Sequence, residues 1–352
     1  MVTEKKLRIA IGGVLLAVVG FSGTAANAEP DLLKANGVDD EAVAEAYYET
    51  IDPNDERLTQ YDWELVNGYH DPINEIVEVA GHFNASDLGF WRRISMVEDK
   101  RRGHKGNIAF TTVNYATEYD AVNDLNAVSI VNMEYSPGPE GDRITKFYIY
   151  DGATGARLTK TVFDPDPATA EELYLPAGCF SCHGGDDDAE APLPDGYNDG
   201  SGETNSGFLA FDFNVFEYGS LVSRAEQEAA VKRLNKGVLR TDPSRAVRKL
   251  VRGLYGGKSL PRATQDSSYM PSSWVSEPEL YQVIVTDCLG CHTLSDSKVL
   301  SLEWWKSNTD ELREAVFEDN FMPNSPFAHR RFWSNGNVNT VLDAIVRFES
   351  GG

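Results

Sequence analysis

The sequence predicts an α+β protein, in which an antiparallel β-containing amino-terminal domain precedes a mostly α-helical region. Three segments, residues 107–115, 127–136 and 144–150, are rich in Ile, Val, Thr, Phe and Tyr, which favour pleated strands. From about residue 223 onward, apolar residues recur at helical spacing instead. Of the 352 residues, 41% are hydrophobic and 11% are aromatic, which is enough to build a sizeable core.

The amino terminus has the features of a secretory signal peptide over residues 1–28. A basic start precedes an uncharged apolar stretch at residues 9–21, and a small-x-small cleavage pattern ends at Ala28. The apolar stretch is shorter than the roughly 20 residues that span a bilayer, which favours cleavage over an uncleaved anchor. We therefore expect a periplasmic or secreted protein, cleaved near Ala28, with no integral membrane segment in the mature chain.

Residues 29–165 are predicted to form the first domain. Helices are expected at about residues 40–48 and 54–69, ahead of the strand segments. Asp-Gly and Thr-Gly turn signals at residues 151–155 then reverse the chain as a hairpin. An Asp-Pro-Asp-Pro string at residues 164–167 marks the boundary, and no cofactor signature precedes it.

All four cysteines of the chain lie in two Cys-x-x-Cys-His strings. The strings comprise Cys179, Cys182 and His183, and Cys288, Cys291 and His292. An exported chain with four Cys would by default form two disulfides, and two Cys-x-x-Cys pairs could also hold zinc. Neither alternative explains the following His, which chance would place after a given pair only roughly 2% of the time.

The order of these residues fits covalent attachment of c-type haem. Two thiols two residues apart reach the two vinyl groups of a haem, and the adjacent imidazole binds iron from one face. The sequence therefore predicts two haem c groups, with His183 and His292 as the proximal iron ligands. Since all four thiols would become thioethers, we expect no disulfide, and no catalytic side chain is assigned.

Residues 274–352 are predicted to form the domain of the second haem. An amphipathic helix is expected at residues 277–287, directly before the attachment string, and a terminal helix at residues 338–348. Between them, Met322-Pro323 follows a helical stretch at residues 310–317.

This order of elements resembles the small mono-haem cytochrome c domain over about residues 274–350. The resemblance implies that Met322 is the distal ligand opposite His292, and a soft thioether raises the reduction potential as an electron carrier requires. His329 is the alternative ligand, and core packing is the alternative role of Met322. The aromatic residue that usually lies one turn before the first Cys is here Ile284.

Residues 166–273 are predicted to form the first haem-binding region, which lacks the cytochrome c pattern. Pro176 and Gly178 break any helix that enters the string, and a stretch rich in Pro, Gly and Asp follows it. Helices are expected at about residues 223–236 and 242–255, the second with an Asp cap and a Pro in its first position.

The distal ligand of the first haem is left open by the sequence. Met270, in a second Met-Pro pair, is the first candidate because of its soft sulfur. His82, His104 and Met96 are alternatives, although a lone His or Met is more often structural. An open position is also possible and would permit peroxide chemistry.

Each of two clusters of charged residues can be interpreted either as solvent-exposed surface or as a functional site. The acidic run at residues 186–188 is interpreted as a solvated turn in preference to a calcium site, which needs six or more ligands. The basic concentration at residues 92–105 is interpreted as a solvated loop, in preference to contacts with haem propionates or an acidic partner.

Two short strings carry a broader resemblance. The Asn-x-x-Asp-Leu-Gly-Phe string at residues 84–90 and the Cys-His-Gly-Gly string at residues 182–185 resemble strings in a poorly characterised family of bacterial secreted proteins with cytochrome c domains. The resemblance spans most of the mature chain and implies no particular substrate.

The sequence as a whole predicts a di-haem cytochrome that transfers electrons between redox partner proteins. The alternative is a di-haem peroxidase or a related haem oxidoreductase with an open site at the first haem. Two-haem bacterial peroxidases attach their first haem close to the mature amino terminus, whereas Cys179 lies far from it. The formal charge of −23 predicts repulsion of nucleic acid and steering of basic partners, or an adaptation to salty surroundings.

Overall fold

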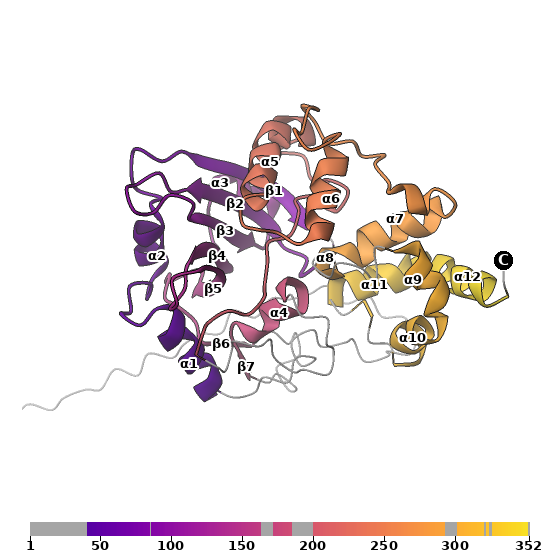
Figure 1. Cartoon of the computed structure of the whole chain (residues 1–352), viewed down its shortest axis with the longest axis horizontal. Helices are drawn as coiled ribbons and strands as arrows, with labels where there is room; N and C mark the ends of the chain where they lie inside the picture. Colours follow the sequence, from indigo (N-terminus) through magenta and orange to yellow (C-terminus); the bar gives the residue numbers. More distant parts are fainter. Residues whose placement is uncertain are drawn as a thin grey trace, which may run out of the picture.

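The protein has an α+β fold, as the sequence predicts: a six-stranded antiparallel sheet is followed by a mostly helical carboxy-terminal region (Figure 1). The computed structural model describes residues 41–84, 86–162, 172–184, 200–292, 301–319, 322–323 and 326–350. The predicted signal peptide, the boundary string at 164–167 and the acidic run at 186–188 lie outside the described residues. Among the residues described, no helix is both long and apolar enough to cross a membrane.

The sheet has the strand order β5-β4-β3-β2-β1-β8, and every neighbouring pair is antiparallel. Its strands are β1 (Ile76–Asn84), β2 (Trp91–Glu98), β3 (Ile108–Tyr115), β4 (Ser129–Pro137), β5 (Arg143–Asp151) and β8 (Phe216–Tyr218). The three predicted strand segments correspond to β3, β4 and β5, whereas the sequence does not predict β1 and β2. The edge strand β8 comes from the predicted first haem-binding region, and its Tyr218 pairs with His82 of β1.

The turn at residues 151–155 reverses the chain, but not into a long hairpin. The Gly155 N–H donates to Asp151 O at 2.8 Å, and a single bridge then joins Tyr150 to Arg157. Strand β6 (Lys160–Val162) leaves the sheet and pairs with β7 (Glu172–Tyr174), which leads to the first attachment string.

One face of the sheet is covered by α2 (Gln60–Asn67) and α3 (Glu118–Asn123), and α1 (Glu41–Ile51) packs against the edge strand β5. The second predicted helix starts later than expected, because Thr59 caps α2: its side chain accepts from the Asp62 N–H at 3.1 Å.

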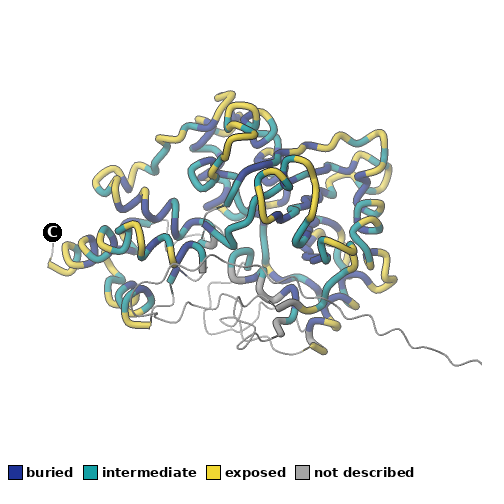
Figure 2. The backbone as a smooth tube through the Cα atoms, turned by 180° about the vertical axis from the view of Figure 1, so that it is seen from behind, coloured by how far each residue is buried: buried dark blue, intermediate teal, exposed yellow. Residues whose placement is uncertain are grey.

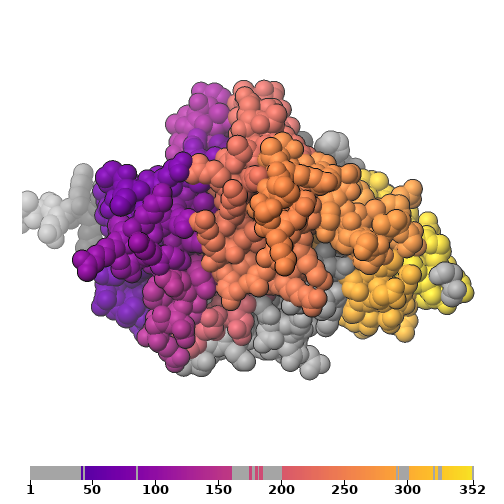
Figure 3. Space-filling model, turned by 45° about the horizontal axis from the view of Figure 1, so that its top comes forward, coloured from indigo at the N-terminus to yellow at the C-terminus, as the bar shows by residue number. Residues whose placement is uncertain are grey.

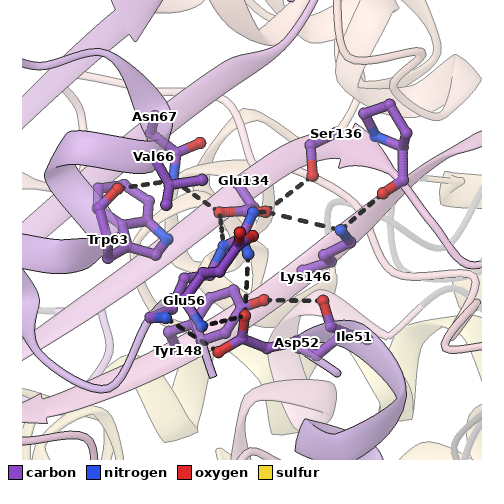
Figure 4. Close-up of polar contacts among 12 residues, drawn as sticks. Ile51, Asp52, Glu56, Trp63, Val66, Asn67, Glu134, Ser136, Lys146 and Tyr148 are labelled. Carbon is purple, nitrogen blue, oxygen red and sulfur yellow. Dashed lines mark hydrogen bonds and ion pairs between the residues drawn. The ribbon is translucent and has the colours of Figure 1, made fainter. Parts of the chain in front are cut away.

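A buried ionic cluster joins these helices to strands β4 and β5 (Figure 4). The Glu134 side chain has no exposed surface, and its carboxylate accepts hydrogen bonds from Arg57 Nε at 3.1 Å and Asn67 Nδ2 at 2.7 Å. Lys146 Nζ lies 3.7 Å away, and Ser136 donates its hydroxyl at 2.8 Å. Burial opposes ionisation of Glu134, but the Arg57 and Lys146 charges outweigh it and hold the pKa below its ordinary value.

The other face of the sheet packs against α5 (Arg224–Val238) and α6 (Arg245–Leu254), which the sequence predicts. Helix α5 approaches so closely that a Cβ on Gly237 would lie 2.1 Å from Met96 Sδ. Helix α6 begins after Ser244, whose hydroxyl accepts from the Val247 N–H at 3.2 Å, and not at the predicted Asp242 cap. Asp242 has a φ of 53° and lies in the preceding turn.

The carboxy-terminal region is a bundle of short helices with its own apolar cluster (Figure 2). Its elements are α7 (Pro278–Asp287), α8 (Leu289–His292), α9 (Leu302–Ser307), α10 (Thr309–Arg313), a π-helical turn (Glu314–Glu318), α11 (Pro326–Ser334) and α12 (Asn337–Glu349). The predicted helices at 277–287, 310–317 and 338–348 match α7, α10 with the π-helical turn, and α12.

The buried ionic cluster gives a stability prediction. Replacing Glu134→Gln removes the only carboxylate that contacts the buried Lys146 in the described chain, while Arg57 keeps its ion pair with Asp52 at 3.0 Å. We expect the free energy of unfolding at pH 7 to fall by about 3–5 kcal/mol, measured by urea unfolding followed by circular dichroism. Because the pKa of folded Glu134 is lowered, the difference from wild type should shrink as the pH falls below about 4.5.

Glu98→Gln is the matched control. Glu98 pairs with Arg240, and both side chains are exposed, at 39% and 56%. Its loss should cost less than about 1 kcal/mol. Equal effects of the two substitutions would contradict the special role of the buried cluster.

Candidate haem-attachment sites

The first attachment string lies on the short helix α4 (Ala177–His183), which begins directly after Pro176. The predicted break before the string is therefore present, and the string itself is helical. Helical spacing brings Cys179, Cys182 and His183 to one side of α4, as attachment to one haem requires.

Phe180 anchors α4 to the sheet. Its side chain is buried, and its ring makes edge contacts with Tyr47 at 6.5 Å and Phe147 at 5.6 Å between ring centroids. The apolar residue inside the string therefore belongs to the core of the amino-terminal domain.

The His183 imidazole is held in an orientation that suits an iron ligand. Its Nδ1 lies 3.0 Å from Gly207 O, and the Gly207 N–H donates to His183 O at 2.9 Å. A protonated Nδ1 that donates to this carbonyl leaves Nε2 as the basic nitrogen, which is the one that can bind iron. Burial lowers the pKa of His183, which favours the neutral imidazole that metal binding needs. The first site therefore fits a haem.

The Cys179 thiol is protonated at neutral pH. Burial raises its pKa to about 12, so it is a protonated thiol and not a reactive thiolate. No three His, Cys, Asp or Glu side chains of the described residues converge as a metal site.

The second attachment string continues the helix that precedes it. The Cys288 N–H donates to Ile284 O at 2.9 Å, and the His292 N–H donates to Cys288 O at 3.1 Å. Ile284 is fully buried, and the aromatic packing comes from Tyr281 one turn earlier, whose ring lies 5.5 Å from Trp274. Helix α7 thus continues into the string, and Ile284 and Tyr281 pack the turn before it.

The carboxylate of Asp287, directly before the second string, holds α7 against the two terminal helices, and no sequence pattern singles it out. The Asp287 side chain has no exposed surface, and it accepts from Arg331 Nε at 2.8 Å and Asn337 Nδ2 at 2.5 Å. These donors come from α11 and α12. The end of α7 is therefore fixed by charge-assisted hydrogen bonds to both terminal helices.

The two candidate Met ligands lie in the same apolar cluster. Met322 and Met270 both pack, partly buried, on the cluster that also contacts Cys288, whereas Cys179 contacts the sheet cluster. The Met322 N–H donates to Ala315 O at 2.9 Å. His329 is buried, with its ring 6.0 Å from Trp333. A ligand role of Met322 stays a prediction, and so does that of Met270, which the structure places with the second string.

The other candidates for the first haem differ strongly in their surroundings. Met96 packs in the core beneath α5, and His104 lies on the surface with its Nδ1 3.6 Å from an Asp99 carboxylate oxygen. His82 is buried against Phe216 at 4.5 Å, and burial lowers its pKa to about 3. Within the described chain, His82 Nε2 is buried without a hydrogen-bond partner, so this neutral nitrogen has the chemistry of a ligand or a haem contact.

The turn between β1 and β2 contacts the surroundings of both strings. Asn84 Oδ1 accepts from the Ser86 N–H at 3.1 Å, and Asn84 Nδ2 donates to Asp87 at 2.9 Å. A Cβ on Gly290, inside the second string, would lie 2.9 Å from Ser86 O. A Cβ on Gly89 would lie 2.6 Å from a ring carbon of Phe327 in α11. Ser86 and Gly89 of this turn therefore join the sheet to the carboxy-terminal helices.

The same turn sets the charge next to the first string. Arg92 donates to Asp87 at 2.6 Å, and both charges act on His183. Arg93 and Arg101 instead pair with carboxylates of their own domain, Glu78 and Asp99. Of the basic concentration at residues 92–105, Arg92 is thus the member beside a candidate site.

The two attachment helices pack directly against each other. Helices α4 and α8 make contacts although more than a hundred residues separate them in the sequence, and they meet near the centre of the molecule (Figure 1). The fold therefore brings the two Cys-x-x-Cys-His strings together, which the sequence does not predict.

No family model, no curated protein and no solved structure matches this chain. The function of the chain is therefore inferred from its own residues alone.

The attachment assignment predicts haem counts. The wild-type protein should contain two haems per chain, and the double variants Cys179→Ala/Cys182→Ala and Cys288→Ala/Cys291→Ala should each retain one, measured as pyridine haemochrome per mole of protein. A wild-type ratio below two would contradict the assignment, and so would a full ratio in either variant.

The ligand assignment predicts a spectral change. Met322→Ala should abolish the iron–thioether absorption band and lower the potential of one haem by on the order of 0.1 V, because a softer ligand favours ferrous iron. Met133→Ala, in the sheet core, is the control and should keep the band. Loss of the band in Met270→Ala but not in Met322→Ala would assign the ligand to Met270 instead.

Proposed function

We propose that this chain is an exported di-haem c-type cytochrome that passes electrons between redox partner proteins. The observation that carries the proposal is the packing of α4 against α8, which brings two haem-attachment strings together in one molecule. Adjacent one-electron centres suit relay within the protein, whereas two unrelated binding sites would need no such contact.

Groups of the chain itself position the residues that would bind the haems. Gly207 O orients the His183 ring, and Asp287 fixes the helix that carries Cys288. The haems, when bound, would supply the one-electron chemistry, and axial ligands and burial would set their potentials. No side chain has to donate or accept a proton, so the proposal needs no catalytic residue.

The charge of the chain supports protein partners of the opposite sign. At a formal charge of −23, long-range steering favours basic redox proteins and disfavours nucleic acid. The signal-like residues 1–28 support function in the periplasm or outside the cell, where covalent haem attachment takes place in this proposal.

One observation favours a second candidate, a di-haem peroxidase. Met270 packs on the cluster of Cys288 and not on that of Cys179, which weakens the first candidate for the distal side of the first haem. An accessible sixth position there would let peroxide reach the iron.

The electron paramagnetic resonance spectrum of the ferric protein separates the two candidates. A carrier should show two low-spin haems, and its reoxidation by peroxide should stay close to that of free low-spin haem peptides. A high-spin haem together with rapid peroxide turnover would overturn the carrier proposal in favour of the peroxidase.

A further inference from the structure

A cavity of about 870 Å³ lies between α6 and the carboxy-terminal helices. Its walls come from α6, the loop that follows, and the helices α7 and α9, and the described residues that line it include no Cys or His of the attachment strings. Small-molecule sites in proteins span roughly 300–1,000 Å³. The cavity is therefore large enough for an organic ligand outside the proposed haem sites.

Helix α6 presents a basic surface in an acidic protein. Its buried side is apolar, and its polar side carries Arg245, Arg248, Lys249 and Arg252 with no acidic residue among them. In Figure 3, the coral and orange surface that includes this helix lies between the sheet region and the carboxy-terminal helices. A positive helix in a chain of charge −23 marks a place where a negative ligand is favoured.

Two of these cations line the cavity without a carboxylate partner. Among the described residues, neither Lys249 nor Arg252 forms an ion pair, and Arg252 Nε is buried without a hydrogen-bond partner. The third cation of the lining, Arg262, is compensated by Asp266 at 2.5 Å. Arg252 is only partly buried and its positive charge has no carboxylate of the described chain beside it, so an anion in the cavity would stabilise this arrangement.

The remaining wall is suited to a flat ring. The Tyr269 ring lies directly on α6 at Gly253, where a Cβ would come within 1.9 Å of Tyr269 Cζ. Glycine inside the helix therefore makes room for an aromatic wall. Tyr281 and Trp304 contribute two further aromatic side chains to the lining.

We propose that this cavity binds an organic anion with a planar ring, of the class of aromatic carboxylates. Its carboxylate would lie near the Arg252 and Lys249 cations, and its ring would pack among Tyr269, Tyr281 and Trp304. The proposal does not rest on the electron-transfer function.

Isothermal titration of the full-length protein with 2-naphthoate tests the site. The neutral analogue 2-naphthylmethanol has nearly the same ring and size, so a difference between them isolates the carboxylate. We expect saturable one-to-one binding of 2-naphthoate that weakens as salt is raised, and at least tenfold weaker binding of the alcohol.

Arg252→Gln should weaken 2-naphthoate binding by about tenfold, because a positive charge beside the bound carboxylate is lost. Arg248→Gln is the matched control on the same helix. Its guanidinium pairs with the exposed Asp242 and does not line the cavity, so binding should change less than about twofold. Lys249→Gln changes an exposed side chain with little risk to folding, and it should weaken binding by about threefold.

Three results would overturn the proposal. They are no binding to the wild-type protein at millimolar 2-naphthoate, equal binding of acid and alcohol, and equal losses in the control and in both cavity variants.

Discussion

The buried carboxylate of Glu134 sets the arrangement on which the rest of the molecule depends. A charge without solvent contact is tolerated only if donors surround it, and here they come from strands β4 and β5 and from the segment around α2. This fixes α2 on one face of the sheet. The opposite face must then be covered by later parts of the chain, namely α4, α5 and α6.

The sheet also determines where the candidate haem sites lie. Phe180 belongs to the sheet core, so α4 cannot move independently of the sheet. The turn between β1 and β2 extends from the same sheet to Ser86 and Gly89, where Gly290 and Phe327 pack on it. The sheet and its β1–β2 turn thus contact both candidate attachment helices, and the packing of α4 on α8 depends on the sheet as well as on the helices themselves.

The sequence predicts the strings, the helices around them and three strands, because each depends on a local pattern. It does not predict β1 and β2, because charged residues interrupt the alternation of β2: Arg93 is neutralised by Glu78 of β1, which only the pairing of the two strands brings close. A bulge at Gly81, with a φ of 73°, further breaks the period of β1. The Asp287 clamp and the packing of α4 on α8 depend on residues far apart in the chain, so no local pattern could reveal them.

The burial of Phe180 bears on the order of events during biogenesis. This residue lies between the two Cys of the first string and packs in the sheet core, so folding fixes the backbone that carries both thiols. If a haem is joined there, the bond must form while the segment is still accessible, before Phe180 enters the core. Maturation would then be a race between cofactor ligation and folding, and a chain that folds first would be trapped without its first haem.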